Sequence, residues 1–220
     1  MRSIGEELLQ LANLEKGLGY TVKMLAIAPG RAIRNYLFED RRRMTRPFAF
    51  LVLTITIATF LTLRFIPTGE ALWKDFQGDV DVQRLPGQLS TILHWFTVAT
   101  NQYMNLLYLS SLPGLALGTY VFFYKKGFNL AEHLVINSYI FSFQNLLYCL
   151  FVPFFLSAPW TGFLLALLLT AYTLFAYLST FEERFWPGTL KSIGSYLLSQ
   201  GVTTFLFLLA GLFLYAWLSL

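Results

Sequence analysis

The chain has few of the residues from which enzyme and metal sites are usually built. It contains one cysteine and two histidines in 220 residues, and 13% of its residues are charged. The single cysteine, Cys149, excludes an internal disulfide framework and a cysteine-based zinc site. The sequence also lacks a phosphate-binding Gly-Lys-[Ser/Thr] loop, a Gly-x-Ser-x-Gly nucleophile elbow and a His-Glu-x-x-His pair. We therefore expect no cofactor, no metal and no catalytic residues, and we favour a protein that is not an enzyme.

Apolar residues are abundant instead, at 56% of the chain, and they gather in five long stretches. Each stretch is close to the ~20 residues that a helix needs to cross a membrane. Since backbone amides in lipid must be satisfied within their own segment, these spans should be helices. The sequence predicts an all-α bundle of about five transmembrane helices, with spans near 47–66, 104–124, 133–156, 160–180 and 197–219. Pro113 leaves open whether the second span is one helix or two.

The basic residues predict an orientation. Nine Lys and Arg precede the first span, two lie between spans two and three, and two lie between spans four and five. The positive-inside rule then places the N-terminus in the cytoplasm and the C-terminus outside. We expect a multi-pass protein of the cytoplasmic (inner) membrane whose first span acts as an uncleaved signal.

Residues 1–46 should form a separate cytoplasmic segment of amphipathic helices ahead of a membrane domain at 47–220. Apolar residues recur at helical spacing up to Leu25, and Pro29-Gly30 should end that helix. A second helix, Arg31 to Met44, suits the headgroup region. Its arginines could dock anionic lipid headgroups or an acidic partner, or simply anchor the orientation. These candidate docking residues are Arg31, Arg34, Arg41, Arg42 and Arg43.

The start of span three is the strongest candidate for chemistry. Glu132 and His133 lie where the chain enters the membrane, and His133, Asn137 and Gln144 share one helical face. Ionisable groups at membrane depth suggest a functional site. The pair could gate a polar pathway or, in a lipid-acting enzyme, perform catalysis. The alternative is interhelical hydrogen bonding, at about 0.6 kcal/mol for each side chain.

The outer segment from Pro67 to about Gln102 contains His94 and Trp95 among loop-forming residues. We expect a surface loop followed by a helix at the outer interface, or by an extension of span two. Trp95 would suit the interface in either case. A lone His94 is more typical of a hydrogen-bonded residue than of a ligand.

Two motifs resemble those of a known family. They are Pro29-Gly30-Arg31-Ala32-Ile33-Arg34-Asn35-Tyr36 and Ala131-Glu132-His133-Leu134-Val135. Together they resemble a bacterial family of multi-pass membrane proteins of unknown function, whose members are usually headed by a zinc ribbon. The resemblance runs from about Leu18 to Ser142. This chain lacks the four cysteines of the ribbon, so no role of zinc carries over. The resemblance implies a bacterial cytoplasmic-membrane protein with Glu132 and His133 at the positions of the family's Glu-His pair.

Three functions remain in view. The first, which we favour, is a noncatalytic membrane subunit or scaffold that binds a protein partner or a second copy of itself within the lipid bilayer. The second is a small oligomeric transporter or channel that uses the polar face of span three. The third is a lipid-acting membrane enzyme. Because topology accounts for the net charge of +4, we expect no binding of nucleic acid.

Overall fold

The computed structural model describes residues 17–66, 91, 104–154, 158 and 160–218, and all regular structure in these residues is helical. This confirms the all-α prediction for the described part of the chain. The helices are Gly17–Ile27, α2 (Pro29–Phe38), α3 (Pro47–Phe65), α6 (Met104–Phe123), α7 (Leu130–Phe151), α8 (Trp160–Phe181) and α9 (Phe185–Leu218). Short 3-10 turns, η2 (Tyr124–Lys126) and η3 (Val152–Phe154), follow α6 and α7. The predicted outer segment, including His94 and Trp95, and the first 16 residues lie outside the described residues.

Three of the described helices are long and apolar enough to cross a membrane. They are Pro47–Phe65, Leu130–Phe154 and Trp160–Phe181, which coincide with predicted spans one, three and four. The predicted second span coincides with α6, which continues through Pro113 as one helix.

The connection between α8 and α9 is shorter than the sequence predicts. Predicted spans four and five leave residues 181–196 between them, but α9 begins at Phe185. The Gly188 N–H donates to the Arg184 carbonyl at 2.9 Å. A proline is tolerated in the first turn of a helix, because no earlier carbonyl is available to its nitrogen, so Pro187 does not delay α9.

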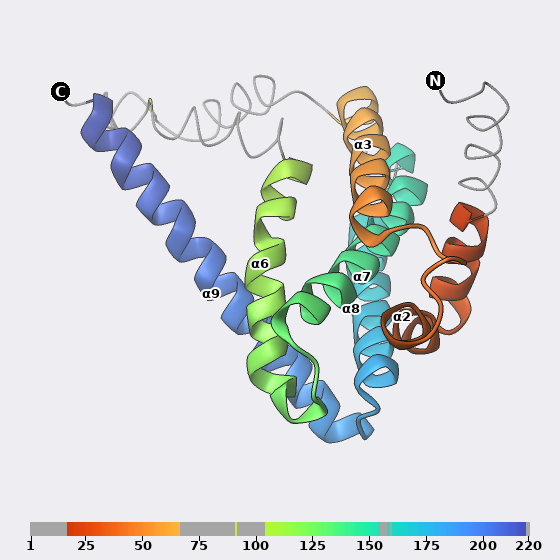
Figure 1. Ribbon diagram of the computed structural model, residues 1–220. Helices are drawn as coiled ribbons and strands as arrows, with labels where there is room; N and C mark the ends of the chain where they lie inside the picture. Colours follow the sequence, from red (N-terminus) through yellow and green to blue (C-terminus); the bar gives the residue numbers. More distant parts are fainter. Residues whose placement is uncertain (1–16, 67–90, 92–103, 155–157, 159, 219–220) are drawn as a thin grey trace, which may run out of the picture.

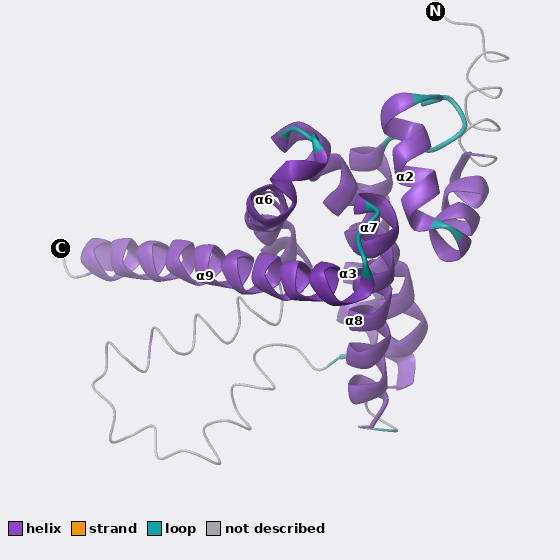
Figure 2. Cartoon of the chain, turned by 90° about the horizontal axis from the view of Figure 1, so that it is seen from below, coloured by secondary structure: helices purple, strands orange, loops and turns teal. Residues whose placement is uncertain are grey.

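The long helices form a bundle from which α9 leans away. In Figure 1, α3, α7 and α8 lie together, with α6 beside them, and the far end of α9 diverges from the rest. Figure 2 shows the same divergence from a perpendicular direction. The α6–α9 contact lies near the start of α9, where the two backbones approach closely. A Cβ at Gly118 would lie 2.3 Å from the Ser195 carbonyl oxygen, so only glycine permits this approach.

The N-terminal helices belong to the main core. Leu25, Ala32 and Ile33 are buried with Tyr139 of α7 and Phe181 of α8. The core therefore joins residues on both sides of the boundary predicted at 46. The break at Pro29-Gly30 is as predicted, since one helix ends at Ile27 and α2 begins at Pro29. However, α2 ends at Phe38, so the helix predicted to reach Met44 is shorter.

Gly30 is what lets α2 reach α8. A Cβ at Gly30 would lie 2.3 Å from the Ser179 carbonyl carbon and 2.6 Å from the Thr180 nitrogen. These are backbone atoms, which cannot rotate aside. The two helices therefore cross at a distance that only glycine allows, and α2 rests against the last turns of α8.

Candidate functional site

Glu132 completes the N-terminal cap of α7. Its carboxylate accepts a hydrogen bond from the Asn129 N–H at 2.7 Å, and the Asn129 side chain accepts one from the Glu132 N–H at 2.9 Å. This is a capping box, which satisfies amides that have no partner within the helix. The position of Glu132 is thus explained by helix capping, and its carboxylate is turned to the backbone of Asn129.

His133 is fully buried at the next position. Its Nδ1 lies 3.0 Å from the Thr119 hydroxyl of α6. The imidazole stacks on Phe181, with ring centres 5.3 Å apart, and meets the edges of Tyr120 and Phe128. Its Nε2 is buried without a hydrogen-bond partner among the described residues. The two residues of the predicted pair therefore have different surroundings, because successive side chains on a helix point about 100° apart.

Asn137, one turn further on, joins three helices. Its Nδ2 donates to the Thr119 hydroxyl oxygen at 2.9 Å and to the His133 carbonyl at 2.8 Å. Its Oδ1 accepts from the Tyr177 hydroxyl of α8 at 2.6 Å. Both amide hydrogens and the amide oxygen are therefore used. We call Thr119, His133, Asn137 and Tyr177 the amide network.

Further along α7, the same face continues to bind its neighbours. Gln144 donates to the Thr173 hydroxyl of α8 at 2.6 Å. The Tyr148 hydroxyl lies 2.9 Å from that of Thr62 on α3. The structure thus brings His133 and Asn137 together and places Gln144 at a separate contact. Sequence reasoning missed Thr119, Thr173 and Tyr177, whose only signal was a hydroxyl within an apolar span.

This arrangement is suited to holding helices together. Neutral hydrogen bonds between buried side chains strengthen packing without exposing charge. Among the residues that the structure describes, no three His, Cys, Asp or Glu side chains gather as metal ligands. The one buried polar atom of the amide network that this packing does not explain is His133 Nε2.

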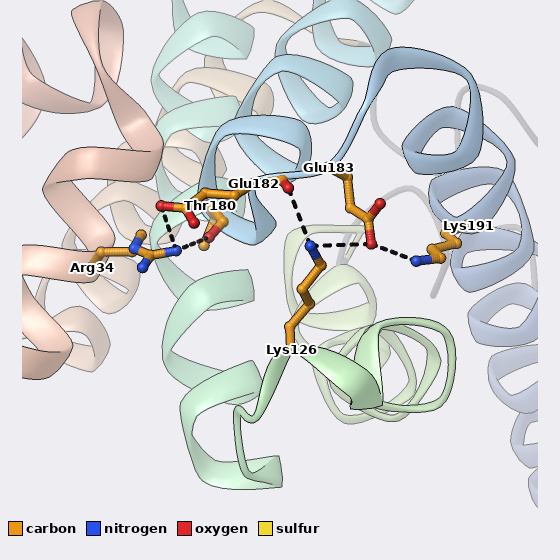
Figure 3. Close-up of polar contacts among 6 residues, drawn as sticks. All are labelled: Arg34, Lys126, Thr180, Glu182, Glu183 and Lys191. Carbon is orange, nitrogen blue, oxygen red and sulfur yellow. Dashed lines mark hydrogen bonds and ion pairs between the residues drawn. The ribbon is translucent and has the colours of Figure 1, made fainter.

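A second polar cluster, which sequence reasoning missed, lies between α2, the η2 turn and the start of α9 (Figure 3). Glu183 binds Lys126, with Nζ and Oε1 3.4 Å apart, and also binds Lys191. Lys126 donates to the Glu182 carbonyl at 3.1 Å. The hydrogen bond from Lys191, together with the charge of Lys126, holds the pKa of the Glu183 carboxyl below its usual value. We call Lys126, Glu183 and Lys191 the lysine clamp.

Glu182 extends this cluster to α2 from an unusual backbone conformation. Its φ is +48°, in the left-handed region that favours glycine. The Glu183 N–H donates back to the Leu178 carbonyl at 3.1 Å, which is the Schellman pattern that ends a helix. The Glu182 carboxylate pairs with Arg34 Nη1 at 2.9 Å, and Nη1 also lies 3.4 Å from the Thr180 carbonyl. A side chain that interacts with Arg34 thus stands where glycine is usual.

The predicted docking arginines fall into two groups. Arg31 and Arg34 lie on α2, where Arg34 is half-buried and Arg31 is exposed. Arg41, Arg42 and Arg43 are all exposed in the turn that follows α2. Asp40 binds two of these three, because it accepts from the Arg42 N–H at 2.9 Å and pairs with Arg43 at 3.5 Å. We call Arg41, Arg42 and Arg43 the arginine turn.

A groove runs between α2 and α8 beside the first group. Its volume is about 560 Å³. The groove is lined by the charged side chains Arg31, Arg34, Glu39 and Glu182 and by the apolar side chains Ile27, Phe38 and Phe175. No signal in the sequence pointed to it, since its two walls are about 140 residues apart in the chain.

Comparison with known proteins gives one similarity. A family model described as a protein of unknown function (DUF3667) matches residues 15–59. The match covers the helix Gly17–Ile27, α2 and most of α3. Neither the curated proteins nor the solved structures contain a match to the chain. About a fifth of this chain, the part that carries Pro29 to Tyr36, is thus similar to an uncharacterised family.

Proposed function

We propose that this protein is a noncatalytic integral membrane subunit or scaffold of a larger membrane complex. The observation that carries the proposal is the amide network. Asn137, Gln144 and Tyr148 of α7 are occupied in contacts with α3, α6 and α8. Four exposed arginines, Arg31, Arg41, Arg42 and Arg43, lie outside the apolar spans, on α2 and in the turn that follows it.

The proposed topology has five spans, with the N-terminus in the cytoplasm and the C-terminus outside. It is supported by α6 and α9, which are 20 and 34 residues long and coincide with or include predicted spans two and five. The contacts of Lys126 with Glu182 and Glu183, and of Arg34 with Glu182, also bring together the three segments that the positive-inside rule assigns to the cytoplasm. Activity reporters fused to each end of the full chain test this topology. If a reporter that functions only in the cytoplasm is active when fused to the C-terminus, the result would contradict this topology.

The arginine turn is the surface we propose for the partner. Its three side chains are exposed, and Asp40 offsets only one of the three charges. An acidic protein segment at the cytoplasmic surface would be attracted to it, and such steering depends on ionic strength. A homo-oligomer would instead suit the alternative of a small oligomeric transporter.

The test is purification of the full chain from its native membrane in mild detergent, with mass spectrometry of the stoichiometric components. The informative variant replaces Arg41, Arg42 and Arg43 with Gln. The control replaces Lys125 and Arg184 with Gln, since both are exposed in other predicted cytoplasmic segments. The proposal expects one partner in fixed ratio, lost from the first variant and kept in the control. Recovery of the wild-type chain alone, as a monomer or as a homo-oligomer, would sink the proposal.

A transporter is the second candidate, and one observation favours it. His133 Nε2 is a buried polar atom without a hydrogen-bond partner among the described residues, at membrane depth in the proposed topology. A substrate or a proton pathway would explain such an atom. Flux into liposomes that contain only this protein, reduced in a His133→Gln variant that still folds, would favour transport over the scaffold.

A further inference from the structure

We propose that the groove between α2 and α8 binds the headgroup of a phospholipid that carries both a phosphate and a primary ammonium group, as phosphatidylethanolamine does. This inference does not depend on the proposed partner, because it concerns a different surface from the arginine turn. It rests on the shape, the charge pattern and the position of the groove.

The first step is the charge pattern. Two arginines and two glutamates line the groove, so its charged side chains sum to no net charge. A purely anionic ligand would meet as much repulsion as attraction. A phosphate close to a primary ammonium presents the complementary arrangement, with guanidinium groups facing the phosphate and carboxylates facing the ammonium.

The second step is that the charged groups keep capacity for a ligand. Arg34 uses one nitrogen, Nη1, for both Glu182 and the Thr180 carbonyl, while a guanidinium has N–H groups on two further nitrogens. Glu182 uses Oε1 for that pair, which leaves its other oxygen as an acceptor. Arg31 lies three residues before Arg34, so both guanidinium groups start from one face of α2. The ion pair between Arg34 and Glu182 therefore fixes the two side chains and leaves them with donors and an acceptor for a ligand.

The third step is the apolar rim. Ile27, Phe38 and Phe175 are 65%, 60% and 46% exposed, although all three are large and apolar. Phe175 belongs to α8, one of the helices that are apolar enough to span a membrane, and lies less than two turns before its last residue, Phe181. Charged side chains beside exposed apolar ones at the end of a span match the boundary between headgroup and acyl chain. A volume of about 560 Å³ is within the usual range of small-molecule sites.

The fourth step is the backbone that shapes the groove. Glycine at position 30 brings α2 against α8, and the left-handed backbone at Glu182 presents its side chain to Arg34. Strained backbone that persists at a ligand-facing position is a reason to suspect binding. Both features are explained if the groove must have this width and this charge at its wall.

The experiment uses the purified full chain in a detergent that is free of lipid. Phosphatidylethanolamine, phosphatidylcholine and phosphatidylglycerol with identical acyl chains are added separately, and native mass spectrometry counts the lipids retained. We expect one phosphatidylethanolamine, bound about tenfold more tightly than either competitor, because a charged hydrogen bond contributes about that much. Phosphatidylcholine has no ammonium hydrogen to donate, and phosphatidylglycerol has no ammonium.

Two variants in the groove and one outside it locate the site. Arg31→Gln and Glu39→Gln should each weaken retention of phosphatidylethanolamine about tenfold, and Arg42→Gln in the arginine turn should leave it unchanged. Thermal unfolding of each variant without lipid shows whether the fold is intact, and Arg31→Lys keeps the charge if Arg31→Gln does not fold. Soluble glycerophosphoethanolamine should bind at least tenfold more weakly than the lipid, since it cannot cover the apolar rim.

Three results would overturn the proposal. Equal retention of all three lipids would show a nonspecific surface, and preference for phosphatidylglycerol would show simple attraction of anions. Wild-type affinity in both groove variants would place the lipid elsewhere. Because none of these results depends on a protein partner, the proposed subunit role would be unaffected by them.

Discussion

The amide network and the lysine clamp are both polar, but they differ in charge and in burial. The network is neutral, buried and made of amide, hydroxyl and imidazole groups between apolar helices. The clamp is charged and lies at the end of the bundle, where its lysines remain about a third exposed. Desolvation explains the difference, since neutral groups can be buried with a hydrogen bond, whereas charges need both a partner and access to water. Removing members of each should therefore have unequal effects.

The largest effect is expected for Asn137→Ala in the amide network. The change removes three hydrogen bonds and leaves the buried Tyr177 hydroxyl without its acceptor. We expect a loss of about 3 kcal/mol in the free energy of unfolding, measured in mixed micelles titrated with denaturing detergent. Gln144→Ala, which removes one half-buried hydrogen bond, is the control and should cost about 1 kcal/mol. Equal losses would mean that Asn137 is not the centre of the network.

Gly30→Ala tests the close approach that carries both the lipid groove and the α2–α8 contact. The new methyl group would lie 2.3 Å from the Ser179 carbonyl carbon, so α2 must move. We expect a loss of about 2 kcal/mol in stability, as for other overpacked sites. Gly19→Ala is the control, because a Cβ there would meet nothing within 4 Å. It should stabilise the helix Gly17–Ile27 by up to ~1 kcal/mol. Stability unchanged by Gly30→Ala would show that α2 is not held tightly against α8.

The lysine clamp should make stability depend on pH. Lys191 and Lys126 lower the pKa of Glu183 in the folded protein, so the unfolded state binds a proton first as pH falls. The contribution of the clamp is complete above the unfolded pKa of about 4.3 and is lost as pH falls through the lower folded value. We expect about 1 kcal/mol, near the upper end for exposed ion pairs. Thermal unfolding between pH 6 and pH 3 measures it.

Glu183→Gln is the matched variant for that titration. It keeps the shape of the side chain and removes the ionisable group. The difference in unfolding temperature between wild type and variant should be present at pH 6 and shrink toward pH 3. A constant difference across that range would assign the effect to packing and not to charge.

The smallest effect is expected for Glu182→Gly. Glycine should relieve the left-handed backbone by about 1 kcal/mol, while the exposed ion pair with Arg34 contributes less than about 1 kcal/mol. We therefore expect unchanged or slightly higher stability by thermal unfolding, together with weaker retention of phosphatidylethanolamine. Glu182→Gln, which removes the charge and keeps the backbone strain, separates the two terms. A clear loss of stability in the glycine variant would show that the ion pair holds α2 in place.

Helix positions were predictable because each apolar stretch is also close to the length of a span. The starts of α3 and α8 at Pro47 and Trp160 agree with the predicted bounds. The fifth span was predicted from residue 197, but α9 begins at Phe185, because Pro187 and Gly188 both fit within a first helical turn. The predicted helix from Arg31 to Met44 was too long for the opposite reason, since its basic residues suit a helix but form an exposed turn after Phe38.

The polar face of α7 was also predictable from the spacing of its residues, whereas the partners of those residues were not. Helical spacing placed His133, Asn137 and Gln144 on one side of a predicted span, but it could not show that Thr119, Thr173 and Tyr177 would meet them. Spacing along one helix carries no information about which neighbour faces it. Glu132 is a related case, since Asn129 and Glu132 carry the signature of a capping box, which accounts for Glu132 without any role for His133.

Composition and spacing alone determined that this chain is helical, that it has apolar segments of membrane length, and that its basic residues are distributed unevenly between the connections. These properties are local, because solvent and backbone hydrogen bonding act on each segment by itself. The tertiary structure decided which side chains are partners: α2 with α8 through Gly30, α6 with α9 through Gly118, and Asn137 with Tyr177. Such contacts join residues far apart in the chain, so they depend on how the helices pack together and not on the pattern within any one of them.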